Sequence, residues 1–538
     1  MAFLTVEALS FTYPNKSAPA LKNVGFTLEP GSLTLLLGAT GSGKSTLLRL
    51  LKPELAPFGK QSGRIRYVGL PGDPTPGDVG FVQQDPNAGI VTDKVYAELA
   101  FAPENAGLTK NEVRLRVGET ASYFGLRALF DRNVESLSGG EKQLLSLAAV
   151  AAADPKLLLL DEPTAMLDPI AAERFFDTLQ RLRRELGLTV LLAEHRFAGI
   201  FQRADRVLAL ENGALTVNDD PAEAAKKLGK TALAGGLPAE TRLWTGLGEQ
   251  GPAPRSLSDG KALLQNRKLS PLPTGAPAPK REPLLTAKAL TFYYAKNTPP
   301  AVDDVTLDFF PGRHLCILGE NGAGKSTLLK LFAGLLPPFS GKVRFRDKDL
   351  KTYKRGSLYV NGVALLPQDP GALFLKDSVK ADLLDAFPGK KDGAGAAIAA
   401  LSDRFGITPL WDAHPLDLSG GEKQKCALVK LLLRSPAVLL LDEPTKGLDA
   451  DGKRTLRETV GALTAQGKAV VTVTPDVEFA ADAADECAFL FRGQLLTRDA
   501  PRPFFAKNRF YVPAAGRLLP GALTVEEILT ACGKGDDA

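Results

Sequence analysis

The sequence predicts an α/β fold that is present twice in tandem. Two sets of short motifs recur in the same order, and the lysines of two glycine-rich loops, Lys44 and Lys325, stand 281 residues apart. In both copies 94 residues separate this lysine from a serine that precedes two glycines, and 21 residues separate the second glycine from an aspartate that ends an apolar run. A repeat kept in such close register indicates two copies of one structural unit.

The expected strands follow from short apolar patterns. The first segment of each copy alternates apolar and polar residues, which is typical of a half-buried strand. Wholly apolar runs followed by acidic residues predict central strands of a parallel sheet. A further short apolar run leads into each glycine-rich loop, and a helix is expected to begin near Ser45 or Ser326. The expected strands are 4–11, 33–37 and 157–160 in the first copy and 284–294, 315–318 and 438–441 in the second.

The bulk composition suits ordinary globular domains. The chain has 538 residues, of which 44% are hydrophobic and 24% charged, and its net charge of +5 gives no reason to expect a nucleic-acid partner. The four cysteines form no CxxC pair, so we expect reduced structural thiols in a cytosolic protein and no metal or disulfide framework. We see no signal-peptide pattern and no apolar run of membrane-spanning length.

Domain boundaries are predicted from changes in composition. Seven prolines crowd between residues 252 and 283, which favours a semi-extended linker. The last 39 residues contain an aromatic cluster at 504–511, so we expect a packed tail. The expected parts are a first domain at 1–245, a linker at 246–283, a second domain at 284–499 and a C-terminal tail at 500–538.

The glycine-rich loops predict a nucleoside triphosphate site in each copy. In the pattern G-x-x-x-x-G-K-S the backbone N–H groups surround phosphate oxygens, the glycines allow positive φ, and the helix N-terminus adds a positive field. The lysines then bridge the β- and γ-phosphates, and Ser45 and Ser326 ligate Mg²⁺. The predicted loop residues are Gly38, Gly41, Gly43, Lys44, Ser45 and Thr46, and Gly319, Gly322, Gly324, Lys325, Ser326 and Thr327.

Acidic residues end the central strands of both copies. Asp161 and Asp442 can reach Mg²⁺ through water, although acids also end strands for structural reasons. The adjacent Glu162 and Glu443 are placed to orient and polarise an attacking water. We therefore expect metal and hydrolytic carboxylates side by side in both copies.

Two further residue types are weaker candidates for contacts with the nucleotide and the metal. Gln84 and Gln368 could sense Mg²⁺ and the attacking water, with an ordinary loop role as the alternative. Tyr13 and Tyr294 stand in matching Phe-x-Tyr segments, where stacking of a base on the ring contributes about 1–3 kcal/mol. The alternative for these tyrosines is a place in the strand core.

A Leu-Ser-Gly-Gly-Glu segment in each copy opens another helix and makes a second anion-binding helix end. Its residues are Ser138, Gly139 and Gly140 in the first copy and Ser419, Gly420 and Gly421 in the second. With these motifs the chain resembles the ATP-binding cassette (ABC) ATPases over nearly its whole length. The resemblance implies a P-loop NTPase core with an antiparallel β subdomain and a helical signature subdomain in each copy, with ATP and Mg²⁺ as cofactors.

The resemblance also implies how the two copies cooperate. In that family two cassettes pair head to tail, and each ATP lies between the phosphate loop of one cassette and the signature of the other. Site one would then be completed by Ser419 and Gly421, and site two by Ser138 and Gly140. The aspartates of the loop at that seam would be Asp168 and Asp449.

The two copies differ at one expected functional position. The resemblance implies that His195 contacts the γ-phosphate and helps to hold the attacking water. The second copy has Pro475 there, which offers no side-chain donor and no N–H, and neither His314 nor His414 is placed to substitute. We therefore expect site two to hydrolyse ATP more slowly than site one. The expected catalytic residues are Glu162, His195 and Glu443.

Segment 95–105 is similar to the cobalt-type and energy-coupling-factor (ECF) importer ATPases. It reads Val-Tyr-Ala-Glu-Leu-Ala-Phe-Ala-Pro-Glu-Asn, against V-x-x-E-[LIV]-A-F-G-x-E-N in that group, and segment 379–383 matches more loosely. The tail at 504–511 also looks like the end of fused double-ATPase subunits of that group. The resemblance implies separate transmembrane T-type and substrate-binding S-type subunits that dock after Gln84 and Gln368, and a peripheral place on the cytoplasmic face of the membrane. Its expected cargo is a vitamin, a vitamin precursor or a metal ion.

Two other functions stay open. Fused sugar-importer ATPases typically have a second signature of Gly-Gly-Asn-Gln form, whereas both copies here read Ser-Gly-Gly-Glu-Lys-Gln. Soluble twin cassettes that act on ribosomes usually carry Thr-Asn-His-Leu-Asp after the glutamate and a long charged linker. Segment 164–168 reads Thr-Ala-Met-Leu-Asp and the linker is rich in proline, so we place this function third, after the sugar importers.

Overall fold

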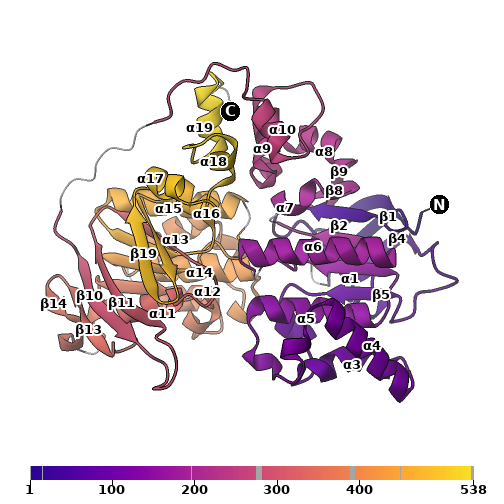
Figure 1. Cartoon of the computed structure of the whole chain (residues 1–538), viewed down its shortest axis with the longest axis horizontal. Coiled ribbons are helices and arrows are strands. Elements are labelled where there is room, and N and C mark those ends of the chain that lie inside the picture. The colour runs from indigo at the N-terminus through magenta and orange to yellow at the C-terminus, as the bar shows by residue number, and fades with distance from the viewer. Residues whose placement is uncertain are drawn as a thin grey trace. The chain divides into compact units, whose positions relative to one another are not determined.

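The computed structural model describes residues 2–14, 16–165, 167–195, 197–273, 281–354, 356–387, 394–448 and 450–534. The chain divides into two compact units, Met1–Leu263 and Leu264–Ala538. The first is drawn in indigo to magenta in Figure 1 and the second in pink to yellow. The division lies inside the proline-rich stretch at 246–283.

The first unit is built on a six-stranded sheet of order β5-β6-β7-β3-β8-β9, in which only β9 is antiparallel to its neighbour. Every residue of β6 is buried, as expected for a parallel strand that is covered on both faces. The carboxyl ends of parallel strands meet at one edge, where their loops can form a site. The strands are β3 (Leu33–Leu37), β5 (Val79–Val82), β6 (Leu157–Asp161), β7 (Thr189–Ala193), β8 (Arg206–Glu211) and β9 (Ala214–Asp219).

A second sheet of the first unit is antiparallel, in the order β2-β1-β4. Its strands are β1 (Leu4–Thr12), β2 (Leu21–Leu28) and β4 (Lys60–Arg66). The inward side chains of β1 and β2 share one core with the helix that follows the glycine loop and with part of β6. This arrangement confirms the predicted antiparallel sheet beside the parallel core.

The helices of the first unit carry clear end signals. The longest, α6, begins with Asp168 as N-cap and Pro169 at its first position, and ends at Gly187 in the left-handed region. In Figure 1 helices α3, α4 and α5 gather at one end of the unit, and α8, α9 and α10 at the other. The helices are α1 (Lys44–Leu50), α2 (Pro86–Gly89), α3 (Val95–Asn105), α4 (Lys110–Tyr123), α5 (Gly139–Ala152), α6 (Pro169–Leu186), α7 (Ala198–Phe201), α8 (Pro221–Leu228), α9 (Ala239–Leu247) and α10 (Leu257–Ala262).

Helix α10 lies in the stretch that composition predicts to be a semi-extended linker. The Ser256 side chain caps it by accepting from Asp259 N at 3.2 Å, and Gln202 Nε2 donates to Pro254 O at 2.8 Å. Leu264, just beyond the helix, is buried. A local cap and a few core contacts are therefore enough to fold part of a proline-rich segment. Residues 274–280 lie outside the described ranges.

The second unit repeats the same architecture. Its six-stranded sheet has the order β15-β16-β17-β12-β18-β19, again with only the last strand antiparallel, and its second sheet has the order β11-β10-β13-β14. The strands are β10 (Leu285–Phe292), β11 (Val302–Phe309), β12 (His314–Leu318), β13 (Ser340–Phe345), β14 (Lys348–Asp349), β15 (Val363–Leu366), β16 (Val438–Asp442), β17 (Ala469–Val473), β18 (Glu486–Phe491) and β19 (Gln494–Asp499). Each strand predicted from the sequence is present in both units.

Helices of the second unit include a short C-terminal group. Phe504 and Phe505 of α17 are buried in the unit's core, whereas Phe510 is 82% exposed. The helices are α11 (Lys325–Phe332), α12 (Val379–Ala386), α13 (Ala394–Phe405), α14 (Gly420–Leu432), α15 (Ala450–Ala465), α16 (Val477–Ala483), α17 (Pro501–Lys507), α18 (Ala514–Leu518) and α19 (Val525–Ala531). Within the described parts of the chain, none of the helices has the length and apolarity needed to cross a membrane.

Candidate active site

Each glycine-rich loop joins the central strand to a helix, β3 to α1 and β12 to α11. Gly43 and Gly324 directly precede these helices at φ of 104° and 100°, and a Cβ there would lie 2.6 Å from Ala20 O and 2.1 Å from Ala301 O. Only glycine fits both the backbone conformation and this close approach. The loops therefore present their backbone N–H groups at a helix N-terminus, as phosphate binding requires.

The loop lysines are buried and folded back over their own loops. Lys44 Nζ donates to Gly38 O at 2.8 Å and to Ala39 O at 3.2 Å. Lys325 Nζ donates to Gly319 O at 2.9 Å and to Glu320 O at 2.8 Å. Both ammonium groups are thus held at the centre of the loop, where the β- and γ-phosphates would lie.

The tyrosines of the antiparallel sheets reach the same loops. The Tyr13 hydroxyl lies 3.0 Å from Thr46 Oγ1, and the Tyr294 hydroxyl lies 2.9 Å from Thr327 Oγ1. Tyr294 is 64% exposed and Tyr13 is half-buried. Tyr13 packs partly against the core of the antiparallel sheet, and both rings retain accessible surface on which a base could stack.

A serine and an aspartate meet in each unit. Ser45 Oγ donates to Asp161 Oδ1, and Ser326 Oγ to Asp442 Oδ1, both at 3.0 Å. Burial raises the pKa of Asp161, and burial together with the nearby charge of Glu443 raises the pKa of Asp442 to about 6. A hydroxyl and a carboxylate beside a phosphate loop suit Mg²⁺, which takes few protein oxygens and completes its shell with phosphate and water. The residues present fit this ion.

The glutamates after these aspartates have the same unusual backbone in both units. Glu162 and Glu443 lie in the left-handed region at φ of 47° and 50°. Their N–H groups donate to Ala193 O at 2.9 Å and to Val473 O at 2.8 Å, so the neighbouring strand holds this conformation. Such strained residues cluster at functional sites.

The glutamines predicted as sensors contact these glutamates. Gln84 Nε2 donates to Glu162 Oε2, and Gln368 Nε2 to Glu443 Oε2, both at 3.1 Å. The structure therefore brings each glutamine to the carboxylate that is expected to polarise water.

The histidine of the first unit completes a compact cluster. His195 Nε2 donates to Glu162 Oε1 at 2.5 Å, and Lys44 Nζ lies 3.5 Å from the same oxygen. Burial alone would raise the pKa of Glu162, but the hydrogen bond from His195 and the charges of His195 and Lys44 bring that pKa below its usual value. The carboxylate is therefore ionised at neutral pH, which a general base must be before it can accept a proton.

The second unit lacks this contact. Pro475 follows Thr474 after β17, and Lys325 Nζ lies 4.0 Å from Glu443 Oε1. His314 is committed to the core at the start of β12, where Nδ1 lies 2.8 Å from Ala483 O and burial lowers its pKa. His414 accepts from Leu416 N at 3.1 Å in the turn ahead of the signature. Both histidines lie where the sequence register predicts.

The signature segments form matching helix starts. Ser138 caps α5 in a reciprocal box with Glu141, whose carboxylate accepts from the serine N and Oγ at 2.7 Å each. Ser419 caps α14 in the same way with Glu422, at 2.8 and 2.6 Å. Asp168 caps α6 by accepting from Ala171 N at 2.8 Å. Asp449 lies outside the described residues.

One buried carboxylate next to this cluster was not predicted from the sequence. Glu194 is only 1% exposed, and its Oε1 accepts from Thr164 N at 3.0 Å and from Thr164 Oγ1 at 2.7 Å. Burial raises its pKa to about 7. The corresponding pair in the second unit is Thr445 and Thr474, whose hydroxyls lie 3.3 Å apart. The change from Glu194 to Thr474 was the available signal, since it adjoins the change from histidine to proline.

Comparison with known proteins agrees with this geometry. The ABC transporter family matches residues 21–165 and 302–446, one stretch in each unit. The chain belongs to the ABC transporter family. It is 36% identical to a "Putative ABC transporter ATP-binding protein" of Bacillus thuringiensis subsp. konkukian (strain 97-27), over 99% of this chain and 98% of that protein. As a tandem ABC ATPase it binds and hydrolyses ATP.

Other relatives extend the comparison. The ABC ATPase is 33% identical to the "Putative HMP/thiamine import ATP-binding protein YkoD" of Bacillus subtilis (strain 168), over 96% of this chain and 95% of that one. A solved structure of the archaeal ribosome recycling factor aABCE1, in complex with the ribosomal stalk protein aP1, covers 93% of the chain at a TM-score of 0.61 and 22% identity. At that identity the likeness shows the tandem fold alone.

Proposed function

We propose that this ABC ATPase is the energising subunit of an ECF-type importer for a vitamin, a vitamin precursor or a metal ion. The V-x-x-E segment at 95–105 supports this, as does the similarity to a relative named for HMP/thiamine import. In this proposal the chain acts at the cytoplasmic face of the cell membrane. Its partners are a transmembrane T-type subunit and a substrate-binding S-type subunit, both separate chains.

The observation that carries this proposal is the environment of Glu98, the acid of that segment. The buried carboxylate accepts from Val91 N at 3.1 Å, Thr92 N at 3.0 Å and Thr92 Oγ1 at 2.8 Å, so it holds the loop between α2 and α3. The same stretch of chain starts at Gln84, which contacts Glu162. A partner that presses on this loop could therefore act on the hydrolytic carboxylate through one short segment.

In the second unit a buried carboxylate also holds the corresponding loop, and it makes one more contact. Asp382, fully buried in α12, accepts from Leu375 N and Lys376 N at 3.1 Å. Lys430 Nζ of α14 donates to Asp382 Oδ1 at 2.5 Å and to Leu373 O at 2.6 Å. In both units a buried carboxylate thus holds the loop after the glutamine in a fixed conformation. This supports a docking role for both loops.

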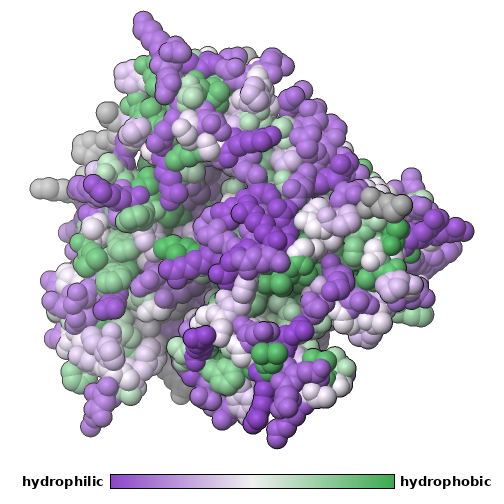
Figure 2. All heavy atoms as spheres, turned by 45° about the vertical axis from the view of Figure 1, so that its right-hand side comes forward, coloured by the Kyte–Doolittle hydropathy of each residue, from purple (hydrophilic) through white to green (hydrophobic). Residues whose placement is uncertain are grey.

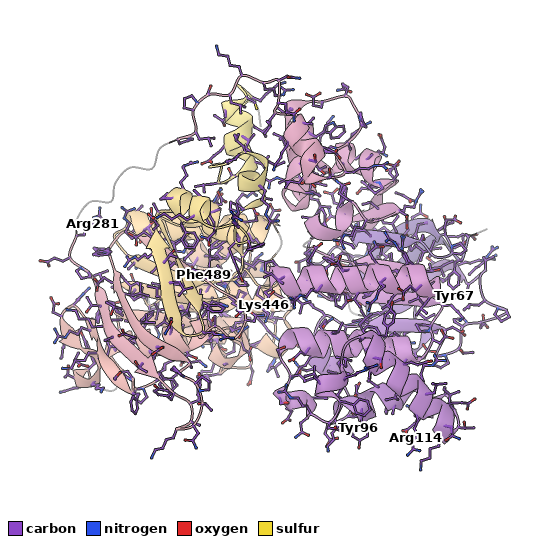
Figure 3. All side chains as sticks on the ribbon, in the orientation of Figure 1. Tyr67, Tyr96, Arg114, Arg281, Lys446 and Phe489 are labelled. Carbon is purple, nitrogen blue, oxygen red and sulfur yellow. The ribbon has the colours of Figure 1, made fainter. Side chains whose placement is uncertain are left out.

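Exposed apolar side chains lie in this loop and on the helix that follows it in the first unit. Val91, Tyr96 and Phe101 are 62%, 43% and 46% exposed, and Figure 3 shows Tyr96 on α3 at the outer end of its unit. Figure 2 shows apolar patches among hydrophilic ones in the lower region, where α3 and α4 lie in Figure 1. Exposed apolar groups close to one another mark interaction surfaces. A hydrophobic helix of a membrane subunit fits this surface.

In the proposed reaction, Mg²⁺ held by Ser45 and Asp161, with Gln84 nearby, would neutralise phosphate charge in site one. Lys44 binds the phosphates, Glu162 accepts a proton from the attacking water, and His195 holds that water and the γ-phosphate in place. Site two would use Ser326, Gln368 and Asp442 for the metal and Glu443 as the base, without a histidine. By family resemblance, the signature at Ser419 completes site one and the signature at Ser138 completes site two.

Affinity purification of the tagged full chain from native membranes, followed by mass spectrometry, tests the partners. The proposal predicts one T-type and one S-type membrane protein. Recovery of a pair of sugar permeases would instead support the sugar-importer function. Recovery of ribosomal proteins without membrane subunits would contradict a transport function.

The Tyr96→Asp variant tests the docking surface. We expect it to lose the membrane subunits in the same purification while the isolated chain still binds ATP, because a charge would lie in an apolar contact. The matched control is Val68→Asp, which changes an apolar residue outside α3 that is 53% exposed, against 43% for Tyr96. Equal recovery of the membrane subunits with both variants would remove α3 from the interface.

A further inference from the structure

The loops of the first unit that carry Glu162 and His195 are joined by Glu194. Thr164 has no part in the reaction proposed above and lies two residues after Glu162. Glu194 immediately precedes His195. Because Glu194 binds Thr164 and His195 binds Glu162, the four residues form a closed ring of contacts between the two loops. The two loops are therefore held together at two contacts, Glu194 with Thr164 and His195 with Glu162.

The same residue is also tied to the strand that enters the phosphate loop. Glu194 N donates to Leu36 O at 3.3 Å, two residues before Gly38. Thr164 and Glu194 are both 1% exposed, so neither the carboxylate nor the threonine donors can exchange these bonds for water. A buried donor without its acceptor is costly, which makes the Glu194 contacts hard to give up.

We propose that Glu194 is a positioning residue for hydrolysis in site one: its carboxylate holds the Thr164 turn so that Glu162 and His195 keep their mutual geometry. Since Glu194 is 1% exposed, the proposal gives it no direct contact with the nucleotide or the attacking water. The proposal rests on the hydrolytic roles given above to Glu162 and His195. Catalytic groups must be held within about 0.5 Å of a productive arrangement by such supporting contacts.

The second unit lacks both the glutamate and the histidine of this ring of contacts. Thr474 is too short to replace a glutamate, and its hydroxyl also accepts from Asp476 N at 3.0 Å. Asp476 is in turn paired with Lys453 at 2.6 Å and caps α16. Thr474 and Pro475 therefore belong to a loop organised around the start of α16, whereas Glu194 and His195 belong to a loop organised around Glu162.

The test compares Glu194→Ala with Glu194→Gln in the purified full chain. The amide oxygen of glutamine can still accept from Thr164, whereas alanine cannot. We expect Glu194→Ala to lower kcat for ATP hydrolysis about tenfold or more, with KM within about twofold, since the contacts of Lys44 and the phosphate loop remain. Glu194→Gln should restore most of kcat.

Thr164→Val provides a second variant that removes only the hydroxyl donor. It should lower kcat less than Glu194→Ala does, and the double variant should be no slower than Glu194→Ala alone, because both act on one contact. Thr474→Val is the matched control in the second unit and should leave kcat within about twofold.

Three results would overturn the proposal: an unchanged kcat in Glu194→Ala, an equal loss in Glu194→Gln, or a rise in KM that accounts for the loss. Glu162→Gln, measured alongside, separates this inference from the function it rests on. If Glu162→Gln leaves hydrolysis intact, the proposed roles of Glu162 and His195 fail. If it abolishes hydrolysis while Glu194→Ala does not, only the positioning role fails.

Discussion

At the scale of single residues, the two units have nearly the same contacts at the predicted metal and glutamine positions and differ beside the predicted catalytic glutamate. The Ser–Asp and Gln–Glu contacts agree between the units to the first decimal of their distances. A clear difference lies after the strands β7 and β17, where the second unit has Thr474 and Pro475 at the positions of Glu194 and His195. We therefore expect the two sites to bind ATP alike and to hydrolyse it at different rates.

Glu194 also predicts how the stability of the first unit depends on pH. Its folded pKa of about 7 lies above the ordinary 4.5, so the native state holds a proton that the unfolded state releases. Stability should therefore fall as pH rises from about 4.5 through about 7, by roughly 3 kcal/mol, and change little above that. Glu194→Gln removes this dependence. The unfolding free energy of the variant minus that of the parent should therefore increase between pH 5 and pH 8.

Urea unfolding followed by tryptophan fluorescence measures this difference. The chain has two tryptophans, Trp244 in the first unit and Trp411 in the second, so a Trp411→Phe background leaves one reporter in the first unit. A constant difference between Glu194→Gln and its parent across this pH range would show that the carboxyl titrates normally.

At the scale of elements, the sequence predicts what is locally encoded. Apolar runs, the glycine loops and the Ser-Gly-Gly-Glu caps specify strands, turns and helix starts from neighbouring residues alone, and each lies where it was predicted. The roles of Glu98 and Glu194 could not be read in this way, because their partners are chosen by how the chain folds. Helix α10 escaped prediction because the proline content of its segment outweighed a single capping serine.

The short helix α17 shows which part of the tail is structural. Phe504 is fully buried in the core of the second unit, so Phe504→Ala should lower that unit's unfolding free energy by about 3–5 kcal/mol. Phe510→Ala, at an 82% exposed position, should change it by less than about 0.5 kcal/mol. Native-state hydrogen exchange of the β16–β18 amides measures both. Similar effects of the two changes would mean that α17 does not belong to this core.

At the scale of the whole molecule, the proposed function assigns the signature of each cassette to the nucleotide of the other. This makes the second cassette necessary for site one even though it lacks the histidine. We therefore expect Ser419→Arg to abolish most of the ATPase activity, because it blocks the better site, and Ser138→Arg to leave an appreciable fraction. If Ser138→Arg were the more harmful change, each signature would serve its own cassette.

Without a histidine in site two, the two sites should hydrolyse ATP at unequal rates. The most direct measurement is the steady-state ATPase activity of the assembled complex carrying Glu162→Gln or Glu443→Gln, with ATP binding checked in both. Glu162→Gln should abolish most of the activity, since it removes the carboxylate that His195 supports, whereas Glu443→Gln should leave an appreciable fraction. Equal losses from the two substitutions would mean that the two sites hydrolyse ATP alike.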